Sequence, residues 1–68
     1  MGIYANIQTI CEERNISIAE LERQCGFERG SVYKWDKNIP SVIRAKTVAD
    51  FLGVPVEDLL KDENEKAQ

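Results

Sequence analysis

The 68-residue sequence contains no histidine, and it has only two cysteines, two prolines and one tryptophan. Histidine is the commonest general base and metal ligand, so its absence argues against an enzyme, a metal site or a bound cofactor. A disulfide-held secreted scaffold of this size would carry four or more cysteines, and we expect Cys11 and Cys25 to be free, buried thiols. No segment approaches the roughly 20 apolar residues that cross a membrane. These absences predict a cytoplasmic protein with no membrane partner and no small-molecule substrate.

The chain is long enough for only one core, because a domain this short buries only about 60% of its unfolded surface. Its net charge is −3, and the acidic excess is confined to one end. Residues 1–56 hold seven basic and seven acidic residues, whereas residues 57–68 hold two basic and five acidic ones. Residues 61–68 also have almost no apolar side chain to bury. We therefore predict a folded domain over residues 1–60 and a disordered acidic tail over residues 61–68.

Apolar residues recur at steps of three and four along most of the chain, which is typical of helices with one buried face. Ser17 followed by Glu20 is the pattern of a capping box, Glu28 and Ser41 are further candidate caps, and Gly26 and Gly53 suit helix ends. No run alternates as a strand would. The sequence predicts five helices, over residues 3–14, 17–25, 28–36 and 42–52 and from about residue 55 to residue 60.

The middle of the chain predicts two short helices joined by a tight turn at Gly26. Apolar side chains stand at fixed offsets on both sides of this glycine, at Leu21, Cys25, Phe27, Val32 and Trp35. Both helices contribute one side to the same small core, so they are expected to meet near a right angle. The outer face of the second helix is then free. This helix lies in a locally basic window, because residues 29–46 hold five basic residues and one acidic residue.

Residues 17–35, SIAELERQCGFERGSVYKW, resemble the helix-turn-helix of Cro and phage-repressor-type regulators, the XRE family. The segments KNIPS at 37–41, VADFLGV at 48–54 and EDLL at 57–60 are similar to later parts of that family in order and spacing. The resemblance covers residues 3–60, and the sequence is similar to Firmicute and prophage-like members. It implies an all-α, compact, five-helix, lambda-repressor-like domain. Two positions depart from the family pattern: Ile18 replaces a frequent glutamine, and Glu22 replaces a small alanine and is expected to project outward or pair with a basic neighbour.

The resemblance implies a sequence-specific transcriptional repressor that binds double-stranded DNA as a homodimer on a two-fold operator. The helix over residues 28–36 would lie in the major groove. Base contacts are expected from Arg29, Gly30, Ser31 and Lys34, and DNA-backbone contacts from Ser17, Tyr33, Lys37, Asn38, Ser41 and Arg44. An alternative is a protein-interaction module with the same fold, such as an antirepressor or adaptor, which the acidic tail and the glutamate-rich second helix would favour.

Overall fold

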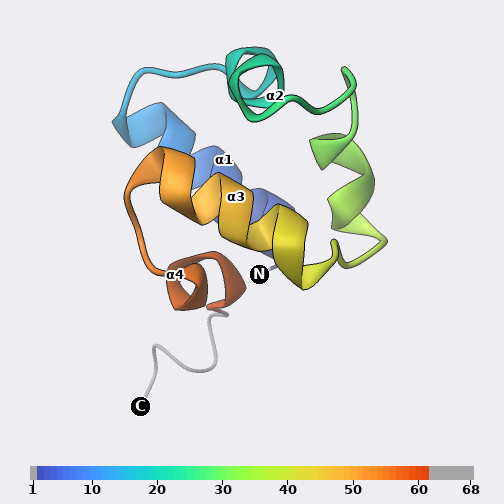
Figure 1. The fold of residues 1–68 in the computed structure, drawn as a ribbon. Helices are drawn as coiled ribbons and strands as arrows, with labels where there is room; N and C mark the ends of the chain where they lie inside the picture. Colours follow the sequence, from blue (N-terminus) through green and yellow to red (C-terminus); the bar gives the residue numbers. More distant parts are fainter. Residues whose placement is uncertain (1, 62–68) are drawn as a thin grey trace.

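The computed structural model describes residues 2–61, which form five short helical segments and no strand. In chain order they are α1 (Ile3–Glu13), α2 (Ile18–Cys25), the 3₁₀ segment η1 (Val32–Asp36), α3 (Val42–Leu52) and α4 (Val56–Leu60) (Figure 1). The all-α class and the order of the segments agree with the prediction. The predicted disordered tail lies outside the described residues, apart from Lys61.

The prediction of five α-helices is wrong in its third member. Residues 29–31 form a turn, and the segment that follows is a 3₁₀ helix beginning at Val32 rather than an α-helix beginning at Glu28. Gly30 adopts φ +89°, a left-handed conformation that cannot continue a right-handed helix. The Glu28 side chain makes no cap, and its backbone carbonyl accepts hydrogen bonds from the amide and the hydroxyl of Ser31 instead.

The other helix boundaries follow from local side-chain chemistry. The Ser17 hydroxyl accepts from the amide of Glu20 at 3.0 Å and begins α2, and the Ser41 hydroxyl accepts from the amide of Arg44 at 3.3 Å and begins α3. Gly26 and Gly53 end these two helices with φ of 76° and 72°. The predicted capping box at Ser17 is therefore half present: the serine cap forms, whereas the carboxylate of Glu20 bonds other side chains of α2.

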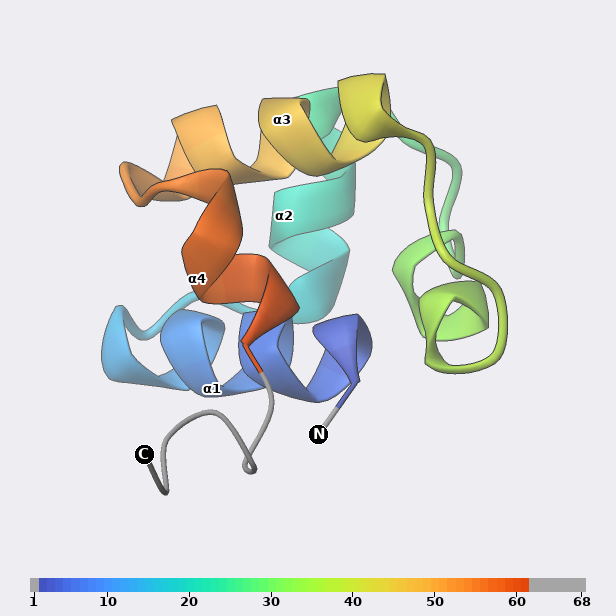
Figure 2. The same cartoon turned by 90° about the horizontal axis from the view of Figure 1, so that it is seen from below.

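One fully buried side chain from each segment meets in the centre of the molecule. These side chains are Ile7, Leu21, Val32, Val48 and Leu59, each 0% exposed. Figure 2 shows α1 and α3 as two layers with α2 and α4 running between them, and α4 packs against both layers. The segment that contains η1 lies at one side of this bundle, where it packs against α1. Helix propensity is a weak determinant in segments this short, so this shared core stabilises them.

The first and last helices are also joined by a polar contact. The side-chain amide of Asn6 donates hydrogen bonds to the backbone carbonyl of Leu59 at 2.8 Å and to that of Lys61 at 2.6 Å. Carbonyls at the end of a helix have no partner within the helix. Asn6 therefore satisfies the carboxyl-terminal end of α4 from α1.

Both cysteines are free, as predicted. Cys11 is buried, while Cys25 is only partly buried. Burial raises the pKa of both thiols, so neither has the lowered pKa of a reactive cysteine. None of the described helices is long and apolar enough to cross a membrane.

Candidate nucleic-acid interface

A groove between η1 and the start of α3 brings together most of the polar residues predicted to contact DNA. We call it the η1–α3 groove. Six predicted residues line it, namely Arg29, Ser31, Lys34, Asn38, Ser41 and Arg44. The remaining lining residues are Glu28, Trp35, Ile39 and Pro40. The turn over residues 29–31, the 3₁₀ segment and the loop before α3 thus place side chains up to 15 residues apart in sequence along one surface.

The η1–α3 groove has an excess of positive charge. Arg29, Lys34 and Arg44 are all exposed, and none of them forms an ion pair with another residue in the range 2–61. Lys46, also in the basic window, is different because its ammonium contacts the carboxylate of Asp50 at 2.9 Å. Only one acidic residue, Glu28, lines the groove. Three free cations against one carboxylate make this surface attractive to a polyanion.

Aromatic packing holds Arg44 at the edge of the η1–α3 groove. Its guanidinium lies over the ring of Phe27, 5.6 Å from the ring centroid. Phe27 in turn meets Trp35 edge-on, with centroids 5.7 Å apart and ring planes at 67°. Trp35 is 6% exposed, as its spacing from Val32 predicted. This chain of contacts fixes the start of α3 relative to η1, and it leaves Arg44 exposed but ordered.

The start of α2 forms a second surface, which shares one residue with the η1–α3 groove. Ser17, Glu20 and Arg23 line a shallow groove that also includes Arg29. Arg29 is thus the residue that joins the predicted backbone contact at Ser17 to the predicted base-reading segment. Ile18, where the family often has glutamine, is partly buried and packs against the core, so it presents no polar group to this surface.

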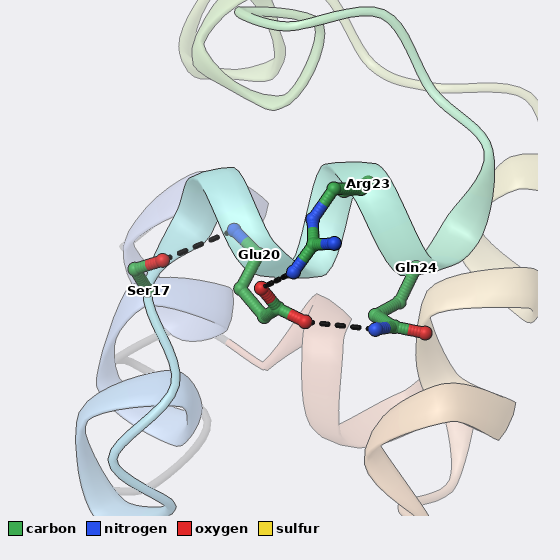
Figure 3. A network of polar contacts seen from close by, with 4 residues as sticks. All are labelled: Ser17, Glu20, Arg23 and Gln24. Carbon is green, nitrogen blue, oxygen red and sulfur yellow. Dashed lines mark hydrogen bonds and ion pairs between the residues drawn. The ribbon is translucent and has the colours of Figure 1, made fainter.

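The side chains of α2 form their own polar network (Figure 3). The carboxylate of Glu20 accepts from the amide nitrogen of Gln24 at 2.8 Å and also pairs with the guanidinium of Arg23. The bond from Gln24, followed by that from Arg23, lowers the pKa of Glu20 below its ordinary value. Arg23 is consequently neutralised within the helix, and it adds less to the positive surface than Arg29 does.

Besides Ser17, which lines the surface at the start of α2, three predicted contact residues lie outside the η1–α3 groove. Tyr33 is 66% exposed, and its ring stacks on Tyr4 of α1 with centroids 5.2 Å apart. Lys37 lines a different groove, beside the start of α1 and the end of α4. Gly30 lines none of the three described grooves, and it lies in a turn rather than in the helix that was predicted.

The structure also shows a residue whose role the sequence did not indicate. Glu22 is 3% exposed, and its two carboxylate oxygens accept hydrogen bonds from the backbone amides of Gly30 and Val32, each at 3.0 Å. The expectation that Glu22 projects outward or pairs with a basic neighbour is therefore wrong. The sequence held one indication of this role. Glu22 stands at a position where the resembled family often has a small alanine, because its two helices approach closely there.

These surfaces carry groups suited to binding a nucleic acid. Among residues 2–61, no group of three or more histidine, cysteine or acidic side chains is placed to hold a metal ion. What the surfaces offer is a set of hydrogen-bond donors and cations, from guanidinium, ammonium, hydroxyl and amide groups. These are the groups that contact phosphates and the edges of bases in duplex DNA.

Comparison with known proteins also indicates DNA binding. A family model described as the Cro/C1-type HTH DNA-binding domain matches residues 6–65, which is most of the chain. The match includes α2, η1 and the whole η1–α3 groove. No curated protein and no solved structure gave a match. The chain therefore belongs to the Cro/C1-type helix-turn-helix DNA-binding family, and it is a DNA-binding regulator.

Proposed function

We propose that this protein is a cytoplasmic repressor that binds a specific two-fold operator as a homodimer. The observation that carries this proposal is the η1–α3 groove, in which Arg29, Lys34 and Arg44 are exposed and free of ion pairs within residues 2–61. The groove lies on the segment that the family uses to contact DNA. Bound there, the protein would occupy the operator and block access to it.

Residues 28–36 are the part of the chain that we place in the major groove. Arg29 is the main base-reading residue, because a guanidinium bonds O6 and N7 of guanine together. Lys34 and Ser31 reach neighbouring bases, and Gly30 allows the backbone to approach closely. The backbone contacts come from Ser17, Tyr33, Lys37, Asn38, Ser41 and Arg44, with the exposed start of α3 adding amide groups that favour a phosphate.

Salt dependence is the first test of this proposal. We expect the affinity for a selected duplex to fall about a thousandfold between 50 mM and 200 mM salt, because a dimer that neutralises about six or more phosphates releases their counterions. Fluorescence anisotropy with selected and scrambled duplexes measures the effect. Equal affinity for both duplexes would contradict sequence-specific reading, and the absence of any salt-dependent binding would contradict DNA binding through the groove.

The dimer is supported by an exposed apolar strip at the edge of the groove, which includes the groove-lining residue Ile39. Ile39, Val42 and Ile43 are 87%, 81% and 78% exposed, which is a large exposure for three aliphatic side chains within five residues. One base-reading segment covers too few base pairs to be selective, so two copies would read half-sites about 34–36 Å apart. Sedimentation with and without a two-fold duplex is expected to show two protein chains per duplex. A saturated complex with one chain per duplex would contradict the dimer.

The second candidate function is a protein-interaction module such as an antirepressor or adaptor. The same apolar strip favours it, together with the net charge of −3. The anisotropy experiment separates the two functions, because an interaction module would show no salt-dependent signal on any duplex.

A further inference from the structure

We propose that Glu22 is a positioning residue for DNA reading, because its buried carboxylate holds the turn over residues 29–31 in the conformation that presents Arg29 and Ser31. The inference rests on the proposed function, since it assigns a role in the same DNA-reading surface. It concerns a residue that does not itself reach DNA. Glu22 is the one buried charged side chain among the described residues.

The backbone around Gly30 forms a small anion-binding site. Gly30 is left-handed with φ +89°, and Ser31 follows in the right-handed helical region with φ −60° and ψ −44°. Successive residues of opposite hand direct their amides toward one point, and such a concavity binds an anion. Here the anion belongs to the protein: one oxygen of Glu22 accepts from the amide of Gly30 and the other from that of Val32, both at 3.0 Å.

These two bonds join the two parts of the helix-turn-helix. Glu22 belongs to α2, and its neighbour Leu21 is 0% exposed in the core. The backbone that carries Glu22 is therefore held in place. Val32 is the first residue of η1 and is also 0% exposed. The carboxylate therefore fixes the turn at its middle residue and at the residue that follows it. A hydrogen bond donated to a charged acceptor at a buried position is stronger than one between neutral groups.

Arg29 and Ser31 depend on this turn for their direction. Their side chains leave the backbone on either side of Gly30, and both line the η1–α3 groove. Their own side chains contribute one local bond, from the hydroxyl of Ser31 to the backbone carbonyl of Glu28 at 2.6 Å. No hydrogen bond or ion pair within residues 2–61 holds the guanidinium of Arg29. The backbone therefore sets where the side chain of Arg29 leaves the chain, and the bonds of Glu22 hold that backbone.

Glu22→Gln is the variant that tests this role. It keeps the size of the side chain but has one acceptor oxygen for two amides, and its NH₂ group would face a donor. We expect the affinity for the selected duplex to fall at least about fivefold, as for the loss of one hydrogen bond to a charged group. The affinity for a scrambled duplex is expected to change less than about twofold, because phosphate contacts need less exact geometry.

Amide hydrogen exchange gives a readout that does not involve DNA. In Glu22→Gln the amides of Gly30 and Val32 are expected to exchange at least about fivefold faster, while amides in the centre of α3 keep their rates. The matched control is Glu12→Gln, which removes an exposed carboxylate of α1 and is expected to change neither readout. Val48→Ala is the stability control, because it weakens the shared core without removing either bond of Glu22 and should leave affinity unchanged wherever the variant is folded.

The outcomes separate the inference from the proposed function. Unchanged affinity for the selected duplex in Glu22→Gln, or unchanged exchange at Gly30 and Val32, overturns the positioning role. Equal losses of affinity in Glu22→Gln and Val48→Ala overturn it as well, since both would then reflect stability alone. If the unchanged protein binds no duplex, the proposed function fails, while the exchange rates still decide whether Glu22 fixes the turn.

Gly30→Ala serves as the second variant if Glu22→Gln does not fold. A Cβ at this position meets no other protein atom within 4 Å, so within the protein the change acts through the left-handed backbone alone, and the exchange rate at Val32 reports that effect apart from any contact with DNA. We expect it to weaken selected binding and to speed exchange at Val32 in the same way. Retention of both properties in Gly30→Ala would overturn the proposal.

Discussion

The Trp35→Ala variant is expected to unfold at much lower urea concentrations than the unchanged protein. Trp35 is 6% exposed, and its ring meets Phe27 edge-on. Truncating a buried tryptophan to alanine costs about 3–5 kcal/mol, while a domain of this length has a free energy of unfolding of roughly 3–10 kcal/mol. The change thus removes a large share of the total. Far-ultraviolet circular dichroism during urea unfolding measures it without using the tryptophan signal.

Tyr33→Ala is the matched control for this experiment, because it truncates an aromatic residue of the same 3₁₀ segment. Tyr33 is 66% exposed, and its main contact is the stack with Tyr4. Such a pair contributes about 0.5–1.5 kcal/mol, so the urea midpoint is expected to move much less. If both variants unfold at the same urea concentration, Trp35 is not the core residue that its burial indicates.

The Arg29→Ala variant is expected to lose selectivity more than general affinity. Arg29 is exposed and lines both the η1–α3 groove and the groove at the start of α2. A bidentate contact to guanine contributes about 1–3 kcal/mol of discrimination, which corresponds to a loss of roughly 5- to 150-fold in affinity for the selected duplex. The scrambled duplex is expected to lose only the small effect of one charge. Anisotropy titrations of both duplexes at one fixed salt concentration give the ratio.

Arg14→Ala is the control for the charge removed. Arg14 is an exposed arginine at the end of α1, which lies on the side of the bundle away from η1 in both Figure 1 and Figure 2. It is expected to leave both affinities nearly unchanged. Equal losses on the selected and the scrambled duplex in Arg29→Ala would assign this arginine to the phosphate backbone rather than to a base.

The helices whose ends depend on neighbouring residues could be predicted from the sequence. The bounds of α3 follow from the cap at Ser41 and the left-handed glycine at 53, which act on residues within one turn of them. The same holds for α2 between Ser17 and Gly26. Apolar spacing then gave the correct inward faces, including that of Trp35. These features depend on residues that are close together in the sequence, so the sequence alone is enough to predict them.

The start of η1 could not be predicted in this way, because the carboxylate that fixes it belongs to another helix. Glu22 precedes its two amide partners by eight and ten residues, and its burial depends on how α2 lies against the core. From the sequence, Glu28 was the nearest candidate cap, and Gly30 suggested close approach to DNA rather than a turn. The presence of a glycine at position 30 was the available signal, since glycine destabilises the interior of a helix.

The candidate interface also has a part that could be predicted from the sequence and a part that could not. Residues close to the turn and to the loop before α3 were predicted together and line one groove, as Arg29, Lys34 and Ser41 do. The surroundings of Tyr33 depend on the register of α1 against η1, which places Tyr4 beneath its ring. Such packing between distant segments was not visible in the sequence. Whether each of these side chains contacts DNA remains a prediction for the titrations described above.

The bonds from Asn6 to the end of α4 have a consequence for how the molecule unfolds. They close a loop of more than fifty residues, so the first and last of the described helices protect each other from fraying, which usually begins near chain ends. Detaching α4 would strip Leu59 from the interior and uncover Ile7 in the same event. Opening from either extremity is thereby coupled to the melting of the whole, and denaturation is expected to be a single cooperative, two-state transition.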